Sequence, residues 1–114
     1  MVEHSAAPLD RVFSAVADPT RRAILEKLGR GPARVTEIAR QFPVSLNAVS
    51  KHVMVLERAG LLHREIQGRD HVLSLEPHLF HNAELWMSKV RKFWEVRLDA
   101  LERHVIEKRR RKLP

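Results

Sequence analysis

Apolar residues recur with a helical period in the first segments of the chain. A first helix is predicted from Leu9 to Ala17. A second follows Asp18, a suitable N-cap, and Pro19, which fits the first helical position because its missing N–H would have no partner there. Gly29 or Gly31 ends it. The apolar positions of these two helices are Leu9, Val12, Phe13, Val16, Ile24, Leu25 and Leu28.

Two further helices are predicted in the stretch TEIARQFPVSLNAVSKHVMVLERAGLL. The third covers residues 36–41, with Thr36 as its cap and Ile38, Ala39 and Phe42 turned inward. The fourth begins after the N-cap Ser45 and stops at Gly60. Its core face holds Leu46, Val49, Val53 and Leu56. The opposite face holds Asn47, Lys51 and Arg58, flanked by Ala48 and Ser50. Two short helices joined by a tight turn are typical of a helix-turn-helix.

After Gly60 the apolar residues change to the alternating pattern of β-strands, and from Pro77 onward they again follow a helical period. LLHREI and HVLSL predict two short strands around a turn at Gly68, and such a hairpin must pack on the helices because it is too small to be stable alone. The last helix is predicted over 77–112. Its apolar stripe comprises Leu79, Ala83, Trp86, Val90, Phe93, Trp94, Leu98, Leu101 and Val105. One small domain can cover only part of this stripe, so the rest is expected to be buried against a second copy of the chain.

These elements predict one mainly α domain over 1–114, a winged helix-turn-helix of order ααααββα. Residues 9–76 form the helices and the wing, and residues 77–112 form a dimerisation helix with a basic tail. The 114 residues suffice for one domain, and 44% of them are hydrophobic. With no cysteine, disulfides and thiolate metal sites are excluded. The sequence shows neither a signal peptide nor a membrane-spanning run, so we expect a cytoplasmic protein without a membrane partner.

The net charge of +7 is concentrated near the C-terminal end. Residues 103–112 hold six Lys or Arg and one Glu, and so contribute +5 of the total. A terminal basic cluster is often only a solvated tail. The charge therefore permits a nucleic-acid partner without establishing one.

The chain resembles the ArsR/SmtB group of bacterial winged-helix transcriptional repressors. The likeness is carried by ADPTRRAILEKL, by the block from TEIARQF to VSLNAVSKHVMVLERAGLL, and by the GR-containing wing, and it covers roughly residues 9 to 105. The tryptophan-bearing last helix, with WEVRLDAL, is similar to a branch that is not organised around metal sensing and often represses its own operon. The resemblance implies a dimer through the first and last helices. The interface residues would be Leu9, Phe13, Trp86, Val90, Trp94, Leu98 and Leu101.

The resemblance also implies that the segment 45–52 enters the major groove of an inverted-repeat DNA operator. Short hydrogen-bonding side chains at a helix start can reach base edges and phosphates, where glutamates would repel the DNA backbone. Arg34 and Thr36 suit a phosphate, and Arg69 at the wing tip suits the minor groove or backbone. For His52, a phosphate contact and packing beside the hairpin are both open. The predicted DNA contacts are Arg34, Thr36, Ser45, Asn47, Ala48, Ser50, Lys51, His52 and Arg69; the alternative for them is an ordinary solvated face.

A metal-responsive sensor is the first alternative. The family's thiolate pattern is impossible here without cysteine, and of its last-helix pattern only His104 and Glu107 are present, with Arg91 and Phe93 at the other two positions. His78, His81 and Glu84 have a helical spacing that could bind a metal ion weakly. They are better explained as solvated residues at the start of the last helix. We therefore predict neither a metal nor another cofactor.

An enzyme and a protein-interaction module are the remaining alternatives. The sequence contains no nucleophile–base motif, no HExxH and no phosphate-binding glycine loop. We therefore predict that the chain is not an enzyme. A winged helix used only for protein interaction would lack the salt-sensitive DNA affinity that a repressor requires. The operator sequence, the regulated genes, any small-molecule effector and the role of the basic tail are not indicated by the sequence.

Overall fold

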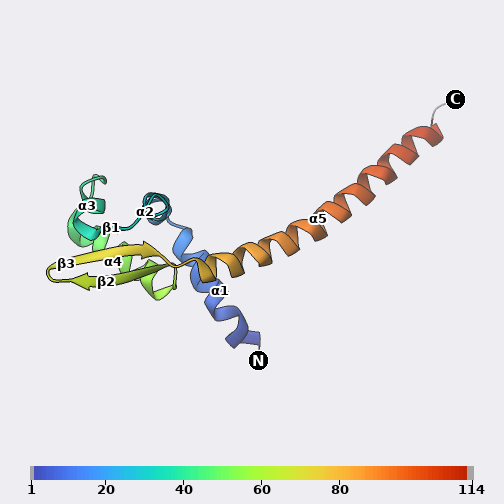
Figure 1. The fold of residues 1–114 in the computed structure, drawn as a ribbon. Coiled ribbons are helices and arrows are strands. Elements are labelled where there is room, and N and C mark those ends of the chain that lie inside the picture. The colour runs from blue at the N-terminus through green and yellow to red at the C-terminus, as the bar shows by residue number, and fades with distance from the viewer. Residues whose placement is uncertain (1, 113–114) are drawn as a thin grey trace. The chain divides into compact units, whose positions relative to one another are not determined.

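The computed structural model describes the backbone of residues 2–112, and the side chains from residue 8 onward. Its element order confirms the predicted mainly α fold with a hairpin (Figure 1). The elements are α1 (Val2–Val16), α2 (Pro19–Leu28), β1 (Ala33–Arg34), α3 (Val35–Ala39), α4 (Leu46–Arg58), β2 (Leu62–Gln67), β3 (Asp70–Leu75) and α5 (Pro77–Lys112).

The start of α2 and both ends of α4 are fixed by the local signals that predicted them. The Asp18 carboxylate accepts a hydrogen bond from the Arg21 backbone N–H at 3.0 Å, and the Ser45 hydroxyl accepts one from the Ala48 N–H at 3.1 Å. These bonds satisfy N–H groups that have no partner inside the helix. At the other end of α4, Gly60 has a φ of +75°, a conformation that glycine adopts without steric cost. The Leu61 N–H then bonds back to the Leu56 carbonyl at 3.0 Å, which closes the helix.

Two predicted helix boundaries were wrong. The first helix begins at Val2 rather than Leu9 and contains Pro8; the two alanines that precede this proline are the strongest helix formers. The third helix is Val35–Ala39, so Thr36 lies inside it and is not its cap. Its N-cap is Arg34, whose side chain makes no capping hydrogen bond. The reason is that Arg34 pairs with Val72 of β3, and the chain passes from this pairing directly into the helix.

The wing is a hairpin of β2 and β3 with a third, very short strand beside it. β2 and β3 pair antiparallel from Leu62 opposite Leu75 to Gln67 opposite Asp70. Gly68 and Arg69 form the turn, and Gly68 has a φ of +64°. The two residues of β1 pair with β3 on its other side, giving the sheet order β1-β3-β2. The sequence predicted only the hairpin, because two paired residues leave no periodic signal.

The hydrophobic core joins the helices to the sheet. Its buried members are Val12, Ala15, Ile24, Leu25, Leu28, Val35, Ile38, Val49, Val53, Leu56, Ala59, Leu61, Leu62, Leu73 and Ala83. Three of the four residues predicted for the core face of α4 are fully buried, but the prediction for the fourth, Leu46, was wrong because its side chain is 51% exposed. Leu46 is the first residue of α4, and it borders a surface hollow instead of the core.

The chain divides into two compact units, residues 1–83 and residues 84–114. Within the second unit, the described residues belong to α5. Large apolar side chains of this stretch are exposed, namely Leu85, Trp86, Met87, Phe93, Trp94, Val96, Leu98, Leu101, Val105 and Ile106. None of the helices in the described part of the chain is both long and apolar enough to cross a membrane.

Candidate nucleic-acid interface

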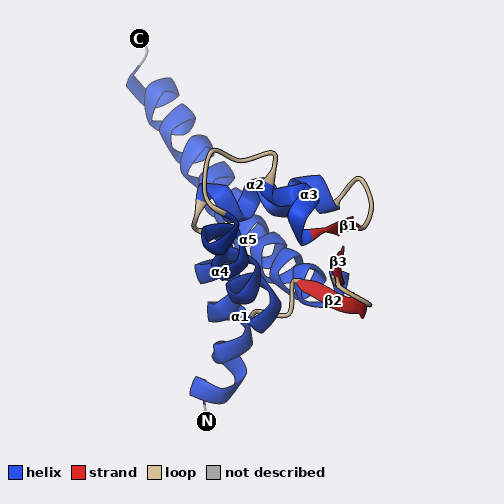
Figure 2. Ribbon diagram, turned by 90° about the vertical axis from the view of Figure 1, so that its left-hand side faces the viewer, coloured by secondary structure: helices blue, strands red, loops and turns tan. Residues whose placement is uncertain are grey.

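The start of α3, the start of α4 and the wing border one surface hollow. These elements lie near one another in Figure 2, and α3 contacts both α4 and β3. The hollow has a volume of about 220 Å³. The residues that line it are Val35, Thr36, Leu46, Ser50, Arg64, Arg69, Asp70 and His71. Three predicted DNA contacts from separate elements, Thr36, Ser50 and Arg69, are thus brought together by the fold.

The rotation of α4 about its own axis is fixed by its buried residues. Val49, Val53 and Leu56 are all fully buried, so the opposite face of the helix points outward. Asn47 and Lys51 are exposed, one turn apart, and Ala48 and Ser50 are half-buried beside them. Ser45 is exposed as well. Its hydroxyl accepts the capping hydrogen bond and can still donate one to a phosphate oxygen.

Arg34 connects α3 with the turn of the wing. Its Nε lies 2.7 Å from Oε1 of Glu37, and its Nη1 lies 3.7 Å from Oδ2 of Asp70. The hydrogen bond with Glu37 raises the pKa of Arg34, and the same bond lowers the pKa of Glu37. Two carboxylates therefore flank this guanidinium, which links α3 to the wing. A phosphate contact by Arg34 stays a prediction.

His52 lies against the start of α2, whereas the sequence left open a phosphate contact and packing beside the hairpin. Its Nδ1 is 3.9 Å from Oδ2 of Asp18 and 3.4 Å from Nη1 of Arg21. Arg21 in turn donates to the backbone carbonyl of Ala15 at 2.7 Å. This cluster links α1, α2 and α4. The pKa of Asp18 is lowered, chiefly by the hydrogen bond from the Arg21 backbone N–H.

Arg64 is a residue of this region that the sequence did not single out. Its Nε and Nη2 lie 3.3 Å from the two carboxylate oxygens of Glu57 on α4. Its Nη1 lies 2.9 Å from Nδ1 of His71 on β3. A guanidinium can only donate, so Nδ1 of His71 is the acceptor. In a hairpin that turns at Gly68–Arg69, the alternation of faces places Arg64 and His71 diagonally opposite each other, and this signal was available in the sequence.

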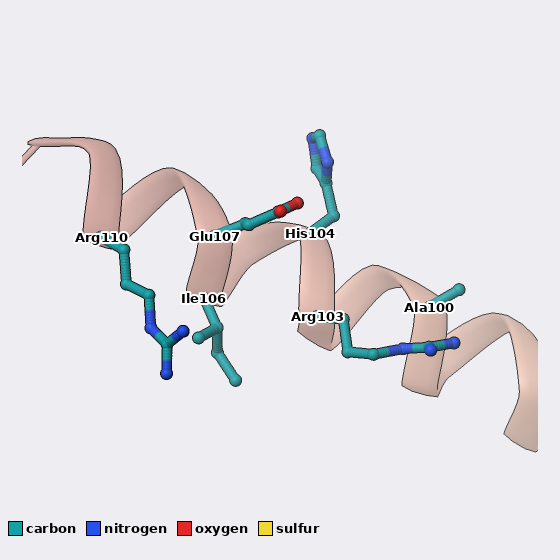
Figure 3. Close-up of a pocket in the computed structure, with 6 residues that line it drawn as sticks. All are labelled: Ala100, Arg103, His104, Ile106, Glu107 and Arg110. Atoms are coloured by element: carbon teal, nitrogen blue, oxygen red, sulfur yellow. The ribbon is translucent and has the colours of Figure 1, made fainter.

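The C-terminal half of α5 carries a second hollow, of about 630 Å³. The residues that line it are Ala100, Arg103, His104, Ile106, Glu107 and Arg110 (Figure 3). All of them come from one helix, and in Figure 3 their side chains leave it in different directions, so they do not enclose a ligand. Across the described residues, no three His, Asp or Glu side chains are grouped so that they could hold a metal ion.

Two short helices, an exposed and capped start of the second helix, and a hairpin that borders the same hollow define a winged helix-turn-helix protein. A family model described as "Helix-turn-helix domain" matches residues 16–65. The HTH-type transcriptional regulator Rv2034 of Mycobacterium tuberculosis is 48% identical over 68 residues, which are 60% of this chain and 64% of that protein. The transcriptional repressor SdpR of Bacillus subtilis is 32% identical over 79 residues, 69% of this chain and 88% of the repressor.

A solved structure supports the same assignment. The crystal structure of the ArsR family transcriptional regulator RHA00566 has a TM-score of 0.73 and 40% sequence identity, and the match covers 77% of this chain and 97% of that one. The chain belongs to the ArsR family of transcriptional regulators. The resemblance drawn from its sequence is confirmed, and its function is that of a DNA-binding regulator of transcription.

Proposed function

We propose that this chain is a homodimeric repressor that binds an inverted-repeat operator in double-stranded DNA and controls its own transcription unit. The observation that carries the proposal is the exposed start of α4 beside a hollow that Thr36, Ser50 and Arg69 border from separate elements. A helix end of this kind fits the major groove, while a neighbouring hairpin reaches the adjacent backbone. SdpR, which shares 32% identity with the chain, is named a transcriptional repressor.

Each predicted contact has a role in this proposal. The Asn47 amide is exposed and has the donor and acceptor needed for a paired contact with adenine. Lys51, one turn further along, serves a base or a phosphate. The hydroxyls of Thr36, Ser45 and Ser50 donate to phosphate oxygens. The small side chain of Ala48 lets the helix approach the DNA closely.

Two arginines complete the proposed contact surface, and a histidine supports it. Arg69 sits exposed in the wing turn and fits the minor groove or the phosphates beside it. Arg34 places its guanidinium at the start of α3, where it fits a phosphate. His52 acts by positioning, because its ring lies against Asp18 and Arg21 at the start of α2. It thereby holds α4 in place for the other contacts.

The homodimer is supported by the apolar stripe of α5. Trp94, Leu98, Leu101 and Val105 recur at intervals of four, three and four residues, the spacing at which two helices pack their apolar edges together. All four are exposed in the single chain. Burying a large apolar side chain fully contributes about 1.5–3 kcal/mol, so pairing two such stripes would stabilise a dimer strongly.

The remaining proposed interface residues lie earlier in α5 and in α1. Trp86 is exposed and Val90 is half-buried on α5. Leu9 and Phe13 of α1 are half-buried against the core. A hollow of about 290 Å³ is bordered by Leu9, Val12 and Leu79. A winged helix-turn-helix fragment from Mycobacterium bovis, 21% identical with a TM-score of 0.65, is described as homodimeric. At this identity the likeness concerns the fold alone.

The proposal is tested by selecting duplexes from a random DNA library with the purified full-length chain. We expect an imperfect inverted repeat with half-site centres about 10 base pairs apart, and an affinity that falls steeply as salt concentration rises. The selected sequence should also occur in front of the gene that encodes the chain. Selection of no sequence, together with salt-independent binding, would contradict the proposal and favour a protein-interaction module.

A further inference from the structure

Leu46 places an apolar side chain at the exposed start of α4. It is 51% exposed, although Val49 and Val53 on the same helix face are fully buried. Its position is fixed, since it directly follows Ser45, whose hydroxyl caps the helix through the Ala48 N–H at 3.1 Å. Leu46 therefore contributes little to the core, and its exposed surface lies at a capped helix end.

The surroundings of Leu46 are polar. The hollow that it borders is also lined by Thr36, Ser50 and Arg69, the side chains proposed to meet DNA. Val35 is the other apolar residue in the lining, and it is buried. Among the described residues that line this hollow, Leu46 is thus the one that offers exposed apolar surface. A single exposed leucine is common on proteins; its place inside this set of polar residues is what needs an explanation.

The major groove of DNA offers one apolar group, the C5-methyl of thymine, among hydrogen-bond donors and acceptors. A leucine against the edge of guanine, adenine or cytosine would remove those polar atoms from water without replacing their hydrogen bonds, which is unfavourable. Against a thymine methyl, the same side chain gains an apolar contact. We infer that Leu46 is a specificity-determining residue that contacts a thymine methyl group in the major groove. The inference rests on the proposed function, because it requires α4 to be the reading helix.

The contact can be tested by removing one methyl group from the DNA. Deoxyuridine pairs as thymidine does and lacks only the C5-methyl. Each thymine of the selected operator is replaced singly by deoxyuridine, and the affinity of each duplex is measured for the full-length wild type and for Leu46→Ala. The control is Val44→Ala, because Val44 is also exposed, at 42%, and is not among the residues that line the hollow.

We expect one thymine in each half-site at which deoxyuridine weakens wild-type binding about fourfold. This is about the effect of leaving one methyl or methylene group unburied. Leu46→Ala should bind the two duplexes equally at that position, and Val44→Ala should show the wild-type loss. Leu46→Val, which keeps a shorter apolar side chain, should show a smaller loss than wild type. Thermal unfolding should show that Leu46→Ala is folded, since the side chain is outside the core.

Two outcomes separate this inference from the proposed function. If the wild type binds its operator selectively, but every deoxyuridine affects wild type and Leu46→Ala alike, Leu46 does not read thymine and the inference is wrong. If the wild type selects no operator, the proposed function itself fails, and the role of Leu46 fails with it.

Discussion

Arg64 and Glu57 form a two-point contact between the wing and α4, with Nε and Nη2 of the arginine each 3.3 Å from a carboxylate oxygen. Both side chains are partly shielded from solvent, with exposures of 22% and 37%. The pair joins β2 to the second half of α4, and Arg64 also lines the hollow at the proposed DNA surface. The contact therefore connects the position of the wing to the position of the helix.

The first prediction is that this contact requires the planar fork of arginine. Arg64→Lys keeps the charge but cannot make two parallel hydrogen bonds. We expect Arg64→Lys, Arg64→Ala and Glu57→Gln each to lower the free energy of unfolding by roughly 1 kcal/mol, measured by urea titration. In a double-mutant cycle, Arg64→Ala and Glu57→Gln should show a coupling of about 0.5–1 kcal/mol. Strict additivity of the two changes would show that the pair contributes nothing.

The second prediction separates the two roles of Ser45. Ser45→Ala removes the cap of α4 and should lower the free energy of unfolding by about 1 kcal/mol. Ser45→Asp keeps a good capping group, so its stability should stay close to that of the wild type. The added negative charge should nevertheless weaken operator binding, because it would face the DNA phosphates. Tight operator binding by Ser45→Asp would argue that the start of α4 does not approach DNA.

The third prediction concerns the exposed face of α4. Asn47→Ala should relax base choice at one operator position, with a loss of roughly 1–3 kcal/mol per site if the contact is bidentate. Lys51→Ala distinguishes a phosphate from a base contact. A phosphate contact means that all sequences are weakened alike and the salt slope falls by about one per subunit. A base contact means that the operator alone is affected.

Neither Asn47→Ala nor Lys51→Ala should unfold the protein, because both side chains are exposed. Arg58→Ala is a matched control, since Arg58 is also exposed but lies at the far end of the helix. Wild-type affinity and specificity in both the Asn47 and Lys51 variants would show that α4 is not the reading helix.

The fourth prediction is a pH dependence that arises from Asp18. The pKa of this carboxyl is lowered in the folded chain, mainly by the backbone hydrogen bond from Arg21. A group whose pKa is lower in the folded state stabilises the fold above its unfolded pKa. That stabilisation is lost as the pH falls through the lowered value, below about pH 4.

Asp18→Ala should therefore have a lower thermal midpoint than wild type at pH 7, and the difference should shrink below pH 4. Asp18→Asn is the control, because asparagine caps helices about as well as aspartate but does not titrate. Its stability at pH 7 should approach that of the wild type. An equal deficit of Asp18→Ala at pH 3 and pH 7 would contradict the assigned cause.

The fifth prediction tests the proposed dimer. Leu98 and Leu101 are 56% and 58% exposed in the single chain, so replacing both with glutamate should leave the winged domain folded while placing charges in the proposed interface. Sedimentation should then show a monomer where the wild type is a dimer. Val96→Glu is the control, because Val96 is 66% exposed but lies on a different face of the same helix. A dimer in the doubly substituted chain, or a monomeric wild type, would contradict the interface.

The sequence by itself determined the elements whose signals are local. Asp18 and Ser45 as caps, Gly60 as a helix end, the turn at Gly68 and the long helix from Pro77 each depend on neighbours within a few residues, so one stretch of chain suffices to predict them. The same signals, with the resemblance of the TEIARQF block and the segment after it, identified the family. They also placed Asn47 and Lys51 on the outer face of α4, because helical period alone sets that face.

Tertiary structure decided the features that depend on residues far apart in the chain. Leu46 follows the apolar period of α4, yet the packing of the described segments leaves its side chain 51% exposed. His52 faces Asp18 and Arg21, more than thirty residues earlier, because α2 packs on α4. Arg64 contacts Glu57 on α4 and His71 on β3. The two residues of β1 form a strand only because they pair with β3. Periodicity tells which side of a helix is apolar, but only the packing of distant segments, or of a second chain, determines whether that side is covered.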